Sequence, residues 1–381
     1  MKITALETLC LSRMHESERQ WVTSRYRTVK ADCAVVLIHT DEGLTGIGEA
    51  SAYGWLTRIA DWVAWLAPTL IGKDPSDPAI APKPTGRGRP HDCAVAGIDC
   101  ALWDLRGKIA GKRVSQLLAP APADRVRLYA SGGCRYDWRH NPEQLIEEAL
   151  GYIEEGYTAM KFRIGTEWSF DGVTVDRFLG HVRELAQAVA GRMDLALDGN
   201  CRLTEEEALP IALEIERLGF IWFEEPIDRN NIAGNARLCA AVEMPITGGE
   251  AFAALEEFRP YIEQKAYDIL QPDAGLSGIT ETARIAEMAA HYGLPVHPHS
   301  WHNGLMCMAH AQMAAALSNI PIVELNQHQG PLQWGILAET PQIESGHLIL
   351  PNRPGLGVEL AENVAQRFPH VEGHYGITVE R

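Results

Sequence analysis

Six polar residues recur along the second half of this 381-residue chain at nearly constant spacing, each following a short apolar run. They are separated by 26, 26, 23, 26 and 25 residues and comprise Asp198, Glu224, Glu250, Asp273, His299 and Glu324. A stretch of helical character lies between successive apolar runs, so the pattern predicts alternating strands and helices. This many units favours a parallel sheet closed into a (β/α)₈ TIM barrel. Because the carboxyl ends of barrel strands meet at one mouth, we expect these residues in one site.

One unit shows the pattern in detail. Asp194–Asp198 is strand-like and ends in a carboxylate. Thr204 and Glu207 have the spacing of a capping box at a helix N-terminus, and Gly219 suits the end of that helix. Pro210 lies inside the predicted helix and is expected to kink it or to delay its start.

The chain on either side of these units follows other patterns. Cys33–His39 and Leu44–Ala50 predict an antiparallel pair of strands joined by a turn, and Asp92–Leu118 predicts helix. We therefore predict three parts: an α+β capping domain over residues 1–123, a modified barrel over 124–345, and a C-terminal segment, 346–381, that returns to the capping domain.

Composition narrows the class of protein. The formal net charge of −16 argues against a nucleic-acid partner. No apolar run approaches the roughly 20 residues that span a membrane, and Met1–Cys10 lacks the features of a secretory signal. The eight cysteines show no CxxC or CxxH spacing, which indicates reduced thiols. We expect an acidic, cytoplasmic protein without a membrane partner.

Three of the recurring residues form a candidate metal site. Asp198, Glu224 and Glu250 supply carboxylates from consecutive predicted strands, a donor set that suits Mg²⁺ better than Zn²⁺. The alternative is a salt-bridged set of barrel carboxylates without a metal. Asn200, two residues after Asp198, is placed to hydrogen-bond the substrate or to support the metal.

His299 is the candidate general base. Asp273, on the preceding predicted strand, is placed to orient His299 and to raise its basicity. His297 and His299 together form an HxH pair, which also occurs in zinc hydrolases. Its position after the three carboxylates disfavours that interpretation, and we expect His297 to be a buried strand histidine.

A strand ending at Arg163 supplies the candidate cations. Alternation places Lys161 and Arg163 on one face of this strand, which indicates recognition of an anionic substrate. The alternative is that both cations neutralise the acidic residues of the mouth. Glu324 needs a proton or a cationic partner to lie beside a developing negative charge.

These residues together resemble the enolase superfamily, specifically its mandelate racemase subgroup, over nearly the whole chain. Cys93–Leu118 is similar to the family's capping-domain helix, and Gly346–Gly357 to its closing segment. The resemblance implies the following roles: Mg²⁺ ligands at Asp198, Glu224 and Glu250, a base dyad of Asp273 and His299, Glu324 as the electrophile on the substrate carboxylate, and Lys161 neutralising that carboxylate. It also implies a small-molecule carboxylate as the partner and a homo-oligomer.

Two positions discriminate between branches of the family. The commonest pattern on the second strand is Lys-x-Lys, whose second lysine is a base, but this chain has Arg163 there. Arginine has a reference pKa of about 12.5 or above and is a poor base. A racemase with a base on each face of the substrate is therefore disfavoured. Asp273 stands where the muconate-lactonizing branch has a lysine base, which disfavours that branch.

The leading hypothesis is a Mg²⁺-dependent dehydratase that removes the α-proton of an acid sugar, passes through an enediolate and forms a 2-keto-3-deoxy acid. The alternatives are an epimerase or racemase, a cycloisomerase of a sugar acid or its lactone, and, remotely, a non-catalytic binding protein on the same barrel. Loops of the capping domain are expected to provide specificity. Their candidate aromatic residues, for each of which ordinary packing is an equal alternative, are Trp21, Tyr26, Tyr53 and Trp55.

Overall fold

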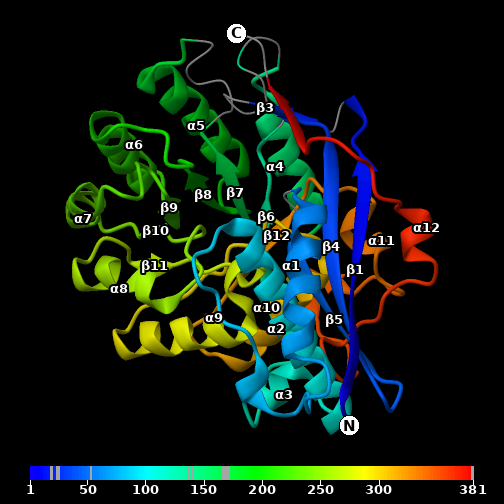
Figure 1. Cartoon of the computed structure of the whole chain (residues 1–381). Coiled ribbons are helices and arrows are strands. Elements are labelled where there is room, and N and C mark those ends of the chain that lie inside the picture. Colours follow the sequence, from blue (N-terminus) through cyan, green and yellow to red (C-terminus); the bar gives the residue numbers. More distant parts are fainter. Residues whose placement is uncertain are drawn as a thin grey trace.

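A computed structural model describes residues 1–17, 20–22, 26–51, 54–134, 138, 141–164 and 172–378. The N-terminal strands and helices, in blue, lie beside a succession of strands and helices that runs from green to orange (Figure 1). The predicted TIM barrel with an α+β capping domain is confirmed.

The capping domain is built on a three-stranded antiparallel sheet. Its order is β1 (Ile3–Met14), β4 (Lys30–Thr40) and β5 (Thr45–Ser51), and the helices that follow are α1 (Leu56–Leu66), α2 (Arg89–Ala110) and α3 (Val114–Leu118). Two short 3₁₀ helices, Ala67–Thr69 and Pro78–Ile80, lie between α1 and α2. Strand β5 lies very close to α2. A Cβ atom on Gly48 would lie only 2.3 Å from the carbonyl oxygen of Gly97. Glycine at this position therefore permits the sheet to pack directly on the helix.

The barrel contains seven parallel strands and one isolated bridge in the described part of the chain. The strands are β6 (Arg125–Ser131), β7 (Ala159–Arg163), β8 (Asp194–Asp198), β9 (Trp222–Glu224), β10 (Ile246–Gly248), β11 (Ile269–Leu270) and β12 (Val323–Asn326). Val296 bridges in parallel to Leu270 and takes the seventh place. The pairing of β12 with β6 closes the barrel.

The helices α4 to α10 follow the first seven barrel positions in order. They are α4 (Gln144–Glu154), α5 (Val175–Val189), α6 (Glu205–Arg217), α7 (Ile232–Ala241), α8 (Leu255–Glu263), α9 (Ala274–His291) and α10 (Gly304–Ala316), followed later by α11 (Leu332–Gly335) and α12 (Val364–Arg367). The capping box of Thr204 and Glu207 is present. Pro210 lies inside α6 but does not delay its start, because the helix already begins at Glu205.

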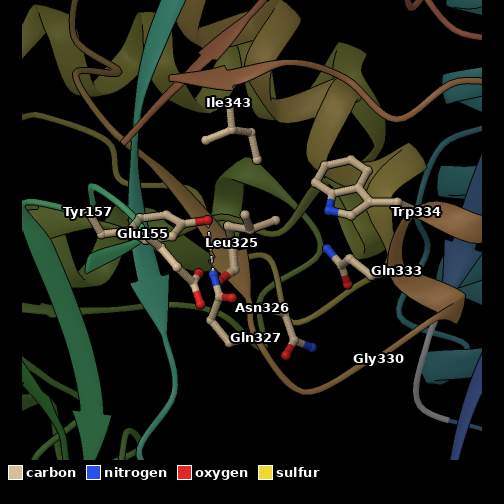
Figure 2. Close-up of a pocket in the computed structure, with 9 residues that line it drawn as sticks. All are labelled: Glu155, Tyr157, Leu325, Asn326, Gln327, Gly330, Gln333, Trp334 and Ile343. Carbon is tan, nitrogen blue, oxygen red and sulfur yellow. Dashed lines mark hydrogen bonds between the residues drawn. The ribbon is translucent and has the colours of Figure 1, made fainter. Parts of the chain in front are cut away.

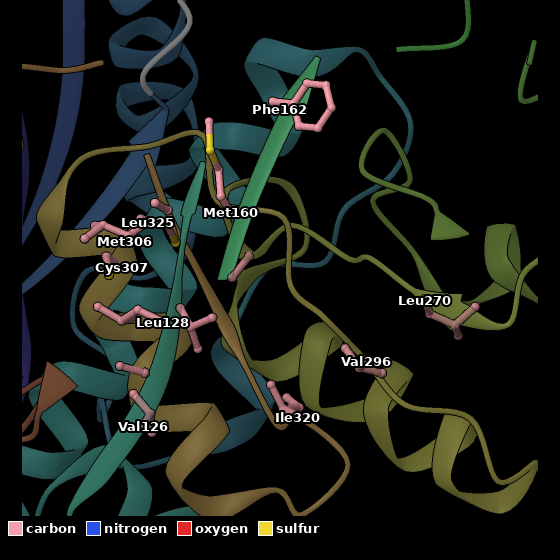
Figure 3. Packing of buried hydrophobic residues seen from close by; sticks show 14 of the residues in the cluster. Val126, Leu128, Met160, Phe162, Leu270, Val296, Met306, Cys307, Ile320 and Leu325 are labelled. Carbon is pink, nitrogen blue, oxygen red and sulfur yellow. The ribbon is translucent and has the colours of Figure 1, made fainter. Parts of the chain in front are cut away.

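Alternation along the barrel strands separates two apolar layers. Leu128, Met160 and Phe162 belong to the layer between strands and helices, which Figure 3 shows together with Met306 and Cys307 of α10. The residues that fill the barrel interior are Tyr129, Ala159, Ala196, Trp222, Ile269 and Ile322. Burial of one large side chain in these layers contributes about 1.5–3 kcal/mol. Lys161, Asp198, Glu224 and Glu324 each follow an interior residue by two positions, so the pleat directs them inward and nearer the mouth.

A buried carboxylate of the capping domain links β5 to the barrel. Glu49, on β5, accepts hydrogen bonds from the backbone nitrogens of Asn303 (2.8 Å) and Met306 (2.9 Å) and from Asn303 Nδ2 (3.2 Å). These donors belong to the N-terminus of α10, where a negative charge is favourable. The link lies directly after the segment that carries His299.

The C-terminal chain contacts both parts of the molecule. Strands β13 (Ile343–Glu344) and β14 (His347–Ile349) form a hairpin, and β14 pairs antiparallel with β6 of the barrel. Farther on, β15 (Gly376–Thr378) pairs with β3 (Tyr26–Thr28), which pairs with β2 (Trp21–Val22). The division at residues 123/124 and 345/346 remains our proposal.

Candidate active site

The recurring polar residues gather at the carboxyl ends of the barrel strands. Asp198 and Glu224 are the last residues of β8 and β9, and Glu324 is the second residue of β12. Four predicted strand ends were wrong. Strand β12 continues to Asn326, and His299 lies three residues beyond the isolated bridge at Val296. Strand β10 ends at Gly248 because Gly249, with φ of 110°, turns the chain before Glu250. Strand β11 ends at Leu270, and Asp273 instead caps the N-terminus of α9.

Lys161 joins two of the carboxylates. Its Nζ lies 2.5 Å from Glu224 Oε1 and 3.0 Å from Glu324 Oε1, and all three side chains are buried. Burial would lower the pKa of Lys161, but these two carboxylates hold it well above its ordinary value. Burial opposes the ionisation of Glu324 too, yet Lys161 and His299 lower its pKa to about 2. Glu324 therefore has the cationic partner that its position requires.

More carboxylates than cations surround Glu224, and this adds to the effect of burial on its pKa. Burial raises its pKa to about 8, and three neighbouring carboxylates add to this rise while Lys161 opposes it. Its second oxygen accepts a hydrogen bond from Gln271 Nε2 at 2.6 Å. The pKa of Asp198 is also raised, chiefly by burial, with Glu250 adding to the effect. An additional cation would relieve this repulsion.

Asn200 holds the carboxylate of Asp198. Its backbone nitrogen and its Nδ2 each donate to one oxygen of Asp198 at 2.7 Å. The chain is left-handed here, with φ of 47° at Asn200 and 58° at Cys201, and again at Glu225, with φ of 36°. Such conformations in residues other than glycine cost about 1–3 kcal/mol each and often occur at functional sites. In the structure Asn200 thus supports a proposed metal ligand.

His299 is oriented from both ring nitrogens. Nδ1 lies 2.9 Å from Asp273 Oδ2, and Nε2 lies 3.1 Å from Glu250 Oε2. Burial alone would lower the pKa of this imidazole, but the carboxylates of Glu250, Glu324 and Asp273 raise it to about 10. His297 lies away from this group, with its ring 5.0 Å from that of Trp222, and burial lowers its pKa to about 4.

His302 shares Asp273 with His299. Its Nε2 lies 2.9 and 2.8 Å from the two carboxylate oxygens, so Asp273 stands between two histidines. Against the effect of burial, these two rings hold the pKa of Asp273 well below its ordinary value. Gly275 permits the arrangement, because a Cβ atom there would lie 2.4 Å from His302 Nε2.

Arg163 lies against two tryptophans, whose ring centroids are 6.0 Å apart and whose planes are nearly perpendicular. Its guanidinium carbon is 4.9 Å from the ring centroid of Trp21 and 4.7 Å from that of Trp301. Such stacking on aromatic faces is typical of arginine and stabilises its charged form. The structure therefore gives Trp21, a candidate substrate-binding residue, a packing partner at the mouth.

A cavity of about 990 Å³ opens above these residues. Arg163, Asn200, Glu250 and His299 line it from the barrel, and Trp21 and Trp55 line it from the capping domain. Trp55 is 46% exposed. Tyr53 and the side chain of Tyr26 lie outside the described residues, so their predicted role in binding stays a prediction.

A second cavity, of about 340 Å³, lies beside the carboxyl end of β12 (Figure 2). Three amide side chains line it, those of Asn326, Gln327 and Gln333, and Gln327 Nε2 donates to the hydroxyl of Tyr157 at 3.3 Å. Among its described lining residues there is no histidine, lysine or arginine. The cavity at the mouth is therefore the one that combines a base with cations.

The three proposed metal ligands fit a divalent cation in type and location. All donate oxygen, lie on consecutive barrel positions and repel one another. Within the ranges that the structure describes, however, no three Asp, Glu, His or Cys side chains converge on one metal position. Each carboxylate instead contacts a protein group: Asp198 contacts Asn200, Glu224 contacts Lys161, and Glu250 contacts His299. Cation binding therefore requires these side chains to turn.

Sequence reasoning missed three residues of the site: Gln271, Trp301 and His302. The spacing of His299 and His302 in the run His-Pro-His-Ser-Trp-His was a signal that could have found His302. Nothing comparable marks Gln271, whose role follows from its contact with Glu224 alone.

Comparison with known proteins identifies the family. Residues 8–119 match the model of the mandelate racemase/muconate lactonizing enzyme N-terminal domain, and residues 144–364 match that of the enolase C-terminal domain-like family. The chain belongs to the mandelate racemase subgroup of the enolase superfamily. It is accordingly an enzyme, a lyase with an isomerase as the alternative.

Three relatives illustrate the similarity. The chain is 31% identical to the arabinonate dehydratase of Saccharolobus solfataricus, over 87% of this chain and 89% of the relative. It is also 31% identical to the D-galactarolactone cycloisomerase of Agrobacterium fabrum, over 97% and 99%. A solved enolase-superfamily structure from Polaromonas sp. JS666 is 30% identical, covers 100% of both chains and has a TM-score of 0.87.

None of the helices within the described ranges combines the length and apolar character needed to cross a membrane.

Proposed function

We propose that this enzyme dehydrates an acid sugar, removing the proton next to its carboxylate and expelling the β-hydroxyl to give a 2-keto-3-deoxy acid. The observation that carries the proposal is the contact of His299 with Asp273, at 2.9 Å, beside a mouth that also holds Lys161 and Glu324. The names of the relatives, a dehydratase of arabinonate and a cycloisomerase of galactarolactone, support a sugar acid or its lactone as the substrate class.

His299 is the proposed base. With Glu250 beside Nε2 the pKa of about 10 keeps the ring protonated, so Glu250 has to turn away before His299 can act as a base. Nε2 of the neutral ring then accepts the α-proton, while the hydrogen bond from Nδ1 to Asp273 fixes the tautomer and stabilises the imidazolium that forms. The protonated ring then returns its proton to the departing hydroxyl when elimination is syn. Loss of the hydroxyl from the other face requires a protonated side chain across the mouth.

Lys161 is proposed to hold the substrate carboxylate, and Glu324, ionised in the described arrangement, has to take up a proton before it can donate a hydrogen bond to that carboxylate. The ammonium of Lys161 offsets the negative charge that develops there as the proton leaves. Glu324 accepts a hydrogen bond from the backbone nitrogen of Ser300 at 2.5 Å, so its position is fixed from the segment that carries His299. The substrate carboxylate therefore has to compete with Glu224 for the ammonium group of Lys161.

Asp198, Glu224 and Glu250 are the proposed ligands of Mg²⁺, on which the superfamily generally depends. When bound, the metal would act as a Lewis acid toward the substrate carboxylate. Isothermal calorimetry with Mg²⁺ tests these ligands without measuring turnover. We expect saturable binding to the unaltered enzyme, at least tenfold weaker binding to Glu224→Gln, and unchanged binding to Gln327→Glu, a matched change at the second cavity. Equal binding to all three proteins would contradict the ligand set.

The identity of Arg163 favours a reaction with one base. A guanidinium stays protonated at neutral pH, and contact with two indole rings favours the charged form, so Arg163 does not act as a base. An epimerase that transfers protons on both faces is less well served by this site. A cycloisomerase shares the first proton removal and stays the second candidate, supported by the relative of that name.

Proton NMR in D₂O tests the reaction. The enzyme with Mg²⁺ is incubated with a library of mono- and dicarboxylate sugar acids and their lactones. We expect a new 3-deoxy methylene signal that carries deuterium, and none with the His299→Asn variant. Exchange of the α-proton without loss of hydroxyl would instead identify an epimerase, and opening or closing of a lactone ring a cycloisomerase. Absence of any change would contradict the proposal.

A cytoplasmic location and a homo-oligomeric assembly complete the proposal. The absence of CxxC spacing and the intermediate or buried position of all eight free cysteines support a reducing compartment. Size-exclusion chromatography with light scattering tests the assembly, and a monomer would contradict it.

A further inference from the structure

The second cavity lies where the barrel has only a short helix. Each of the first seven barrel positions is followed by a helix of at least nine residues, whereas β12 is followed by α11, which has four. The cavity is bounded by the loop before β7, the end of β12, α11 and β13 (Figure 2). Its volume of about 340 Å³ is near the lower end of the range of about 300–1,000 Å³ for small-molecule sites. It shares no described lining residue with the cavity at the mouth.

The amide of Gln333 is buried beside this cavity without a hydrogen-bond partner in the described part of the chain. The residue is 6% exposed, and neither its Nε2 nor its Oε1 makes a hydrogen bond there. Figure 2 shows the amide turned toward the space that the labelled side chains surround. Buried amides are nearly always paired with protein groups, ordered water or a ligand. Gln333 therefore indicates that a polar molecule binds in the cavity.

A second amide adds a donor at the same place. Asn326 is 2% exposed and lines the cavity. Its Oδ1 accepts a hydrogen bond from the backbone nitrogen of His328 at 2.8 Å, and its Nδ2 has no partner among the described residues. Gln327 differs from both, because its Nε2 donates to the hydroxyl of Tyr157 and to the carbonyl oxygen of Leu325, each at 3.3 Å. The unpaired groups are therefore two amide nitrogens and one amide oxygen.

Apolar side chains complete the walls of the cavity, namely those of Leu325, Trp334 and Ile343. The indole of Trp334 packs against the first residue of α10, because a Cβ atom on Gly304 would lie 2.3 Å from its Cε3 atom. An indole beside amide donors and acceptors suits a molecule that combines hydroxyl groups with C–H faces.

The charge of the lining residues favours a neutral molecule. Glu155, which is exposed, is the only Asp, Glu, Lys, Arg or His among the described residues that line this cavity. An anion would therefore find no cation there. A cation would offer no acceptor to the two amide nitrogens, whereas a hydroxyl group both donates and accepts.

We propose that this cavity is a second binding site, for a neutral monosaccharide or cyclic polyol. Gln333 and Asn326 hydrogen-bond its hydroxyl groups, and Trp334 contacts one of its C–H faces. The site is separate from the barrel mouth, so this proposal does not rest on the proposed function.

Saturation-transfer NMR with D-galactose and myo-inositol tests for the site. Cyclohexanol, a six-membered carbon ring with one hydroxyl group, is the matched comparison for myo-inositol. We expect saturable binding of at least one of the two polyols, and binding of cyclohexanol at least about tenfold weaker. Absence of saturable binding by both polyols would overturn the proposal, since water alone would then pair with the amides. Equal binding of cyclohexanol would overturn the recognition of hydroxyl groups.

The variant Gln333→Met locates the site, because it removes the amide and keeps an unbranched side chain. We expect polyol binding to weaken about tenfold. Gln187→Met, the same substitution at an exposed residue of α5 outside both cavities, is the matched control and should bind as the unaltered enzyme does. Equal binding by Gln333→Met and the unaltered enzyme would overturn the assignment.

Two further measurements separate this site from the mouth and from folding. His299→Asn alters the mouth alone, so it should leave polyol binding unchanged, and a loss there would place the polyol at the mouth and overturn the proposal. Gln333→Met should unfold at an unchanged or higher temperature, because its amide has no protein partner to lose. A clearly lower unfolding temperature would assign this amide to the fold and overturn its role in binding.

Discussion

Two segments at the barrel mouth hold positive charge in different ways. At the end of β7, Lys161 is paired with two buried carboxylates, and the guanidinium of Arg163 contacts two indole rings. In the segment after Val296, His299 and His302 share the carboxylate of Asp273. The first pair keeps its protons near neutral pH, whereas an imidazole can give up a proton when its partners change. On the proposed roles, proton transfer and charge neutralisation are therefore assigned to separate segments of the mouth.

The largest expected effect comes from His299→Asn. Loss of a general base should reduce kcat by about 10²–10⁴-fold, while the asparagine amide can still donate to Asp273 and preserve the segment. Turnover is measured by NMR and Mg²⁺ binding by calorimetry. Normal turnover by the variant would contradict this division of roles, because the base would then have to lie at the end of β7.

Lys161→Met should have the next largest effect, and on two properties. It leaves Glu224 and Glu324 buried without their cation, so we expect unfolding in urea to become easier by about 3–5 kcal/mol, together with loss of activity. Lys161→Arg retains the charge and serves as the control, with a smaller loss of stability. Unchanged stability in Lys161→Met would show that these buried pairs contribute nothing.

His302→Asn sharpens the comparison within the histidine segment. Asp273 would lose one of its two ring partners and hold His299 less exactly in place, so we expect kcat to fall about tenfold, a small part of the total from acid–base catalysis. KM should stay within twofold, because His302 does not line the cavity. A rise in KM with unchanged kcat would assign His302 to substrate binding, and loss of the thermal transition would assign it to folding.

The smallest effect is expected from Arg163→Lys. Lysine can serve as a base, so α-proton exchange on the face opposite His299 should rise several-fold, while His299-dependent dehydration changes little. Deuterium incorporation, followed by NMR, measures both. The absence of any such rise would weaken the view that Arg163 makes the unaltered enzyme one-sided.

Strand alternation explains why much of the site was predictable. Asp198 and Glu224 follow the interior residues Ala196 and Trp222 by two positions, so their direction could be deduced once the strands were recognised. The same rule placed Lys161 and Glu324. In the capping domain, the pair of β4 and β5 and the helical stretch that contains α2 and α3 were also predicted, because their apolar periodicity is local, whereas β1 and α1 were not.

Features that depend on side-chain choice or on distant contacts could not be deduced in this way. Apolar patterning did not show that Gly249 would end β10 early, or that Asp273 would cap a helix instead of ending a strand. Trp21 and Arg163 lie far apart in sequence, and no periodicity relates them. Lys161 had several carboxylates within reach, and only coordinates show that it contacts Glu224 and Glu324.

The contact of Glu49 with the start of α10 has a consequence for protein engineering. Exchanging capping domains between members of this subgroup is an obvious route to altered specificity, since that domain supplies part of the entrance. Here such a chimera would have to bring a carboxylate to the place of Glu49, because the donors of Asn303 and Met306 would otherwise be buried without an acceptor at the base of the segment that carries His299. In such chimeras, residues 49, 303 and 306 should therefore be kept or exchanged together.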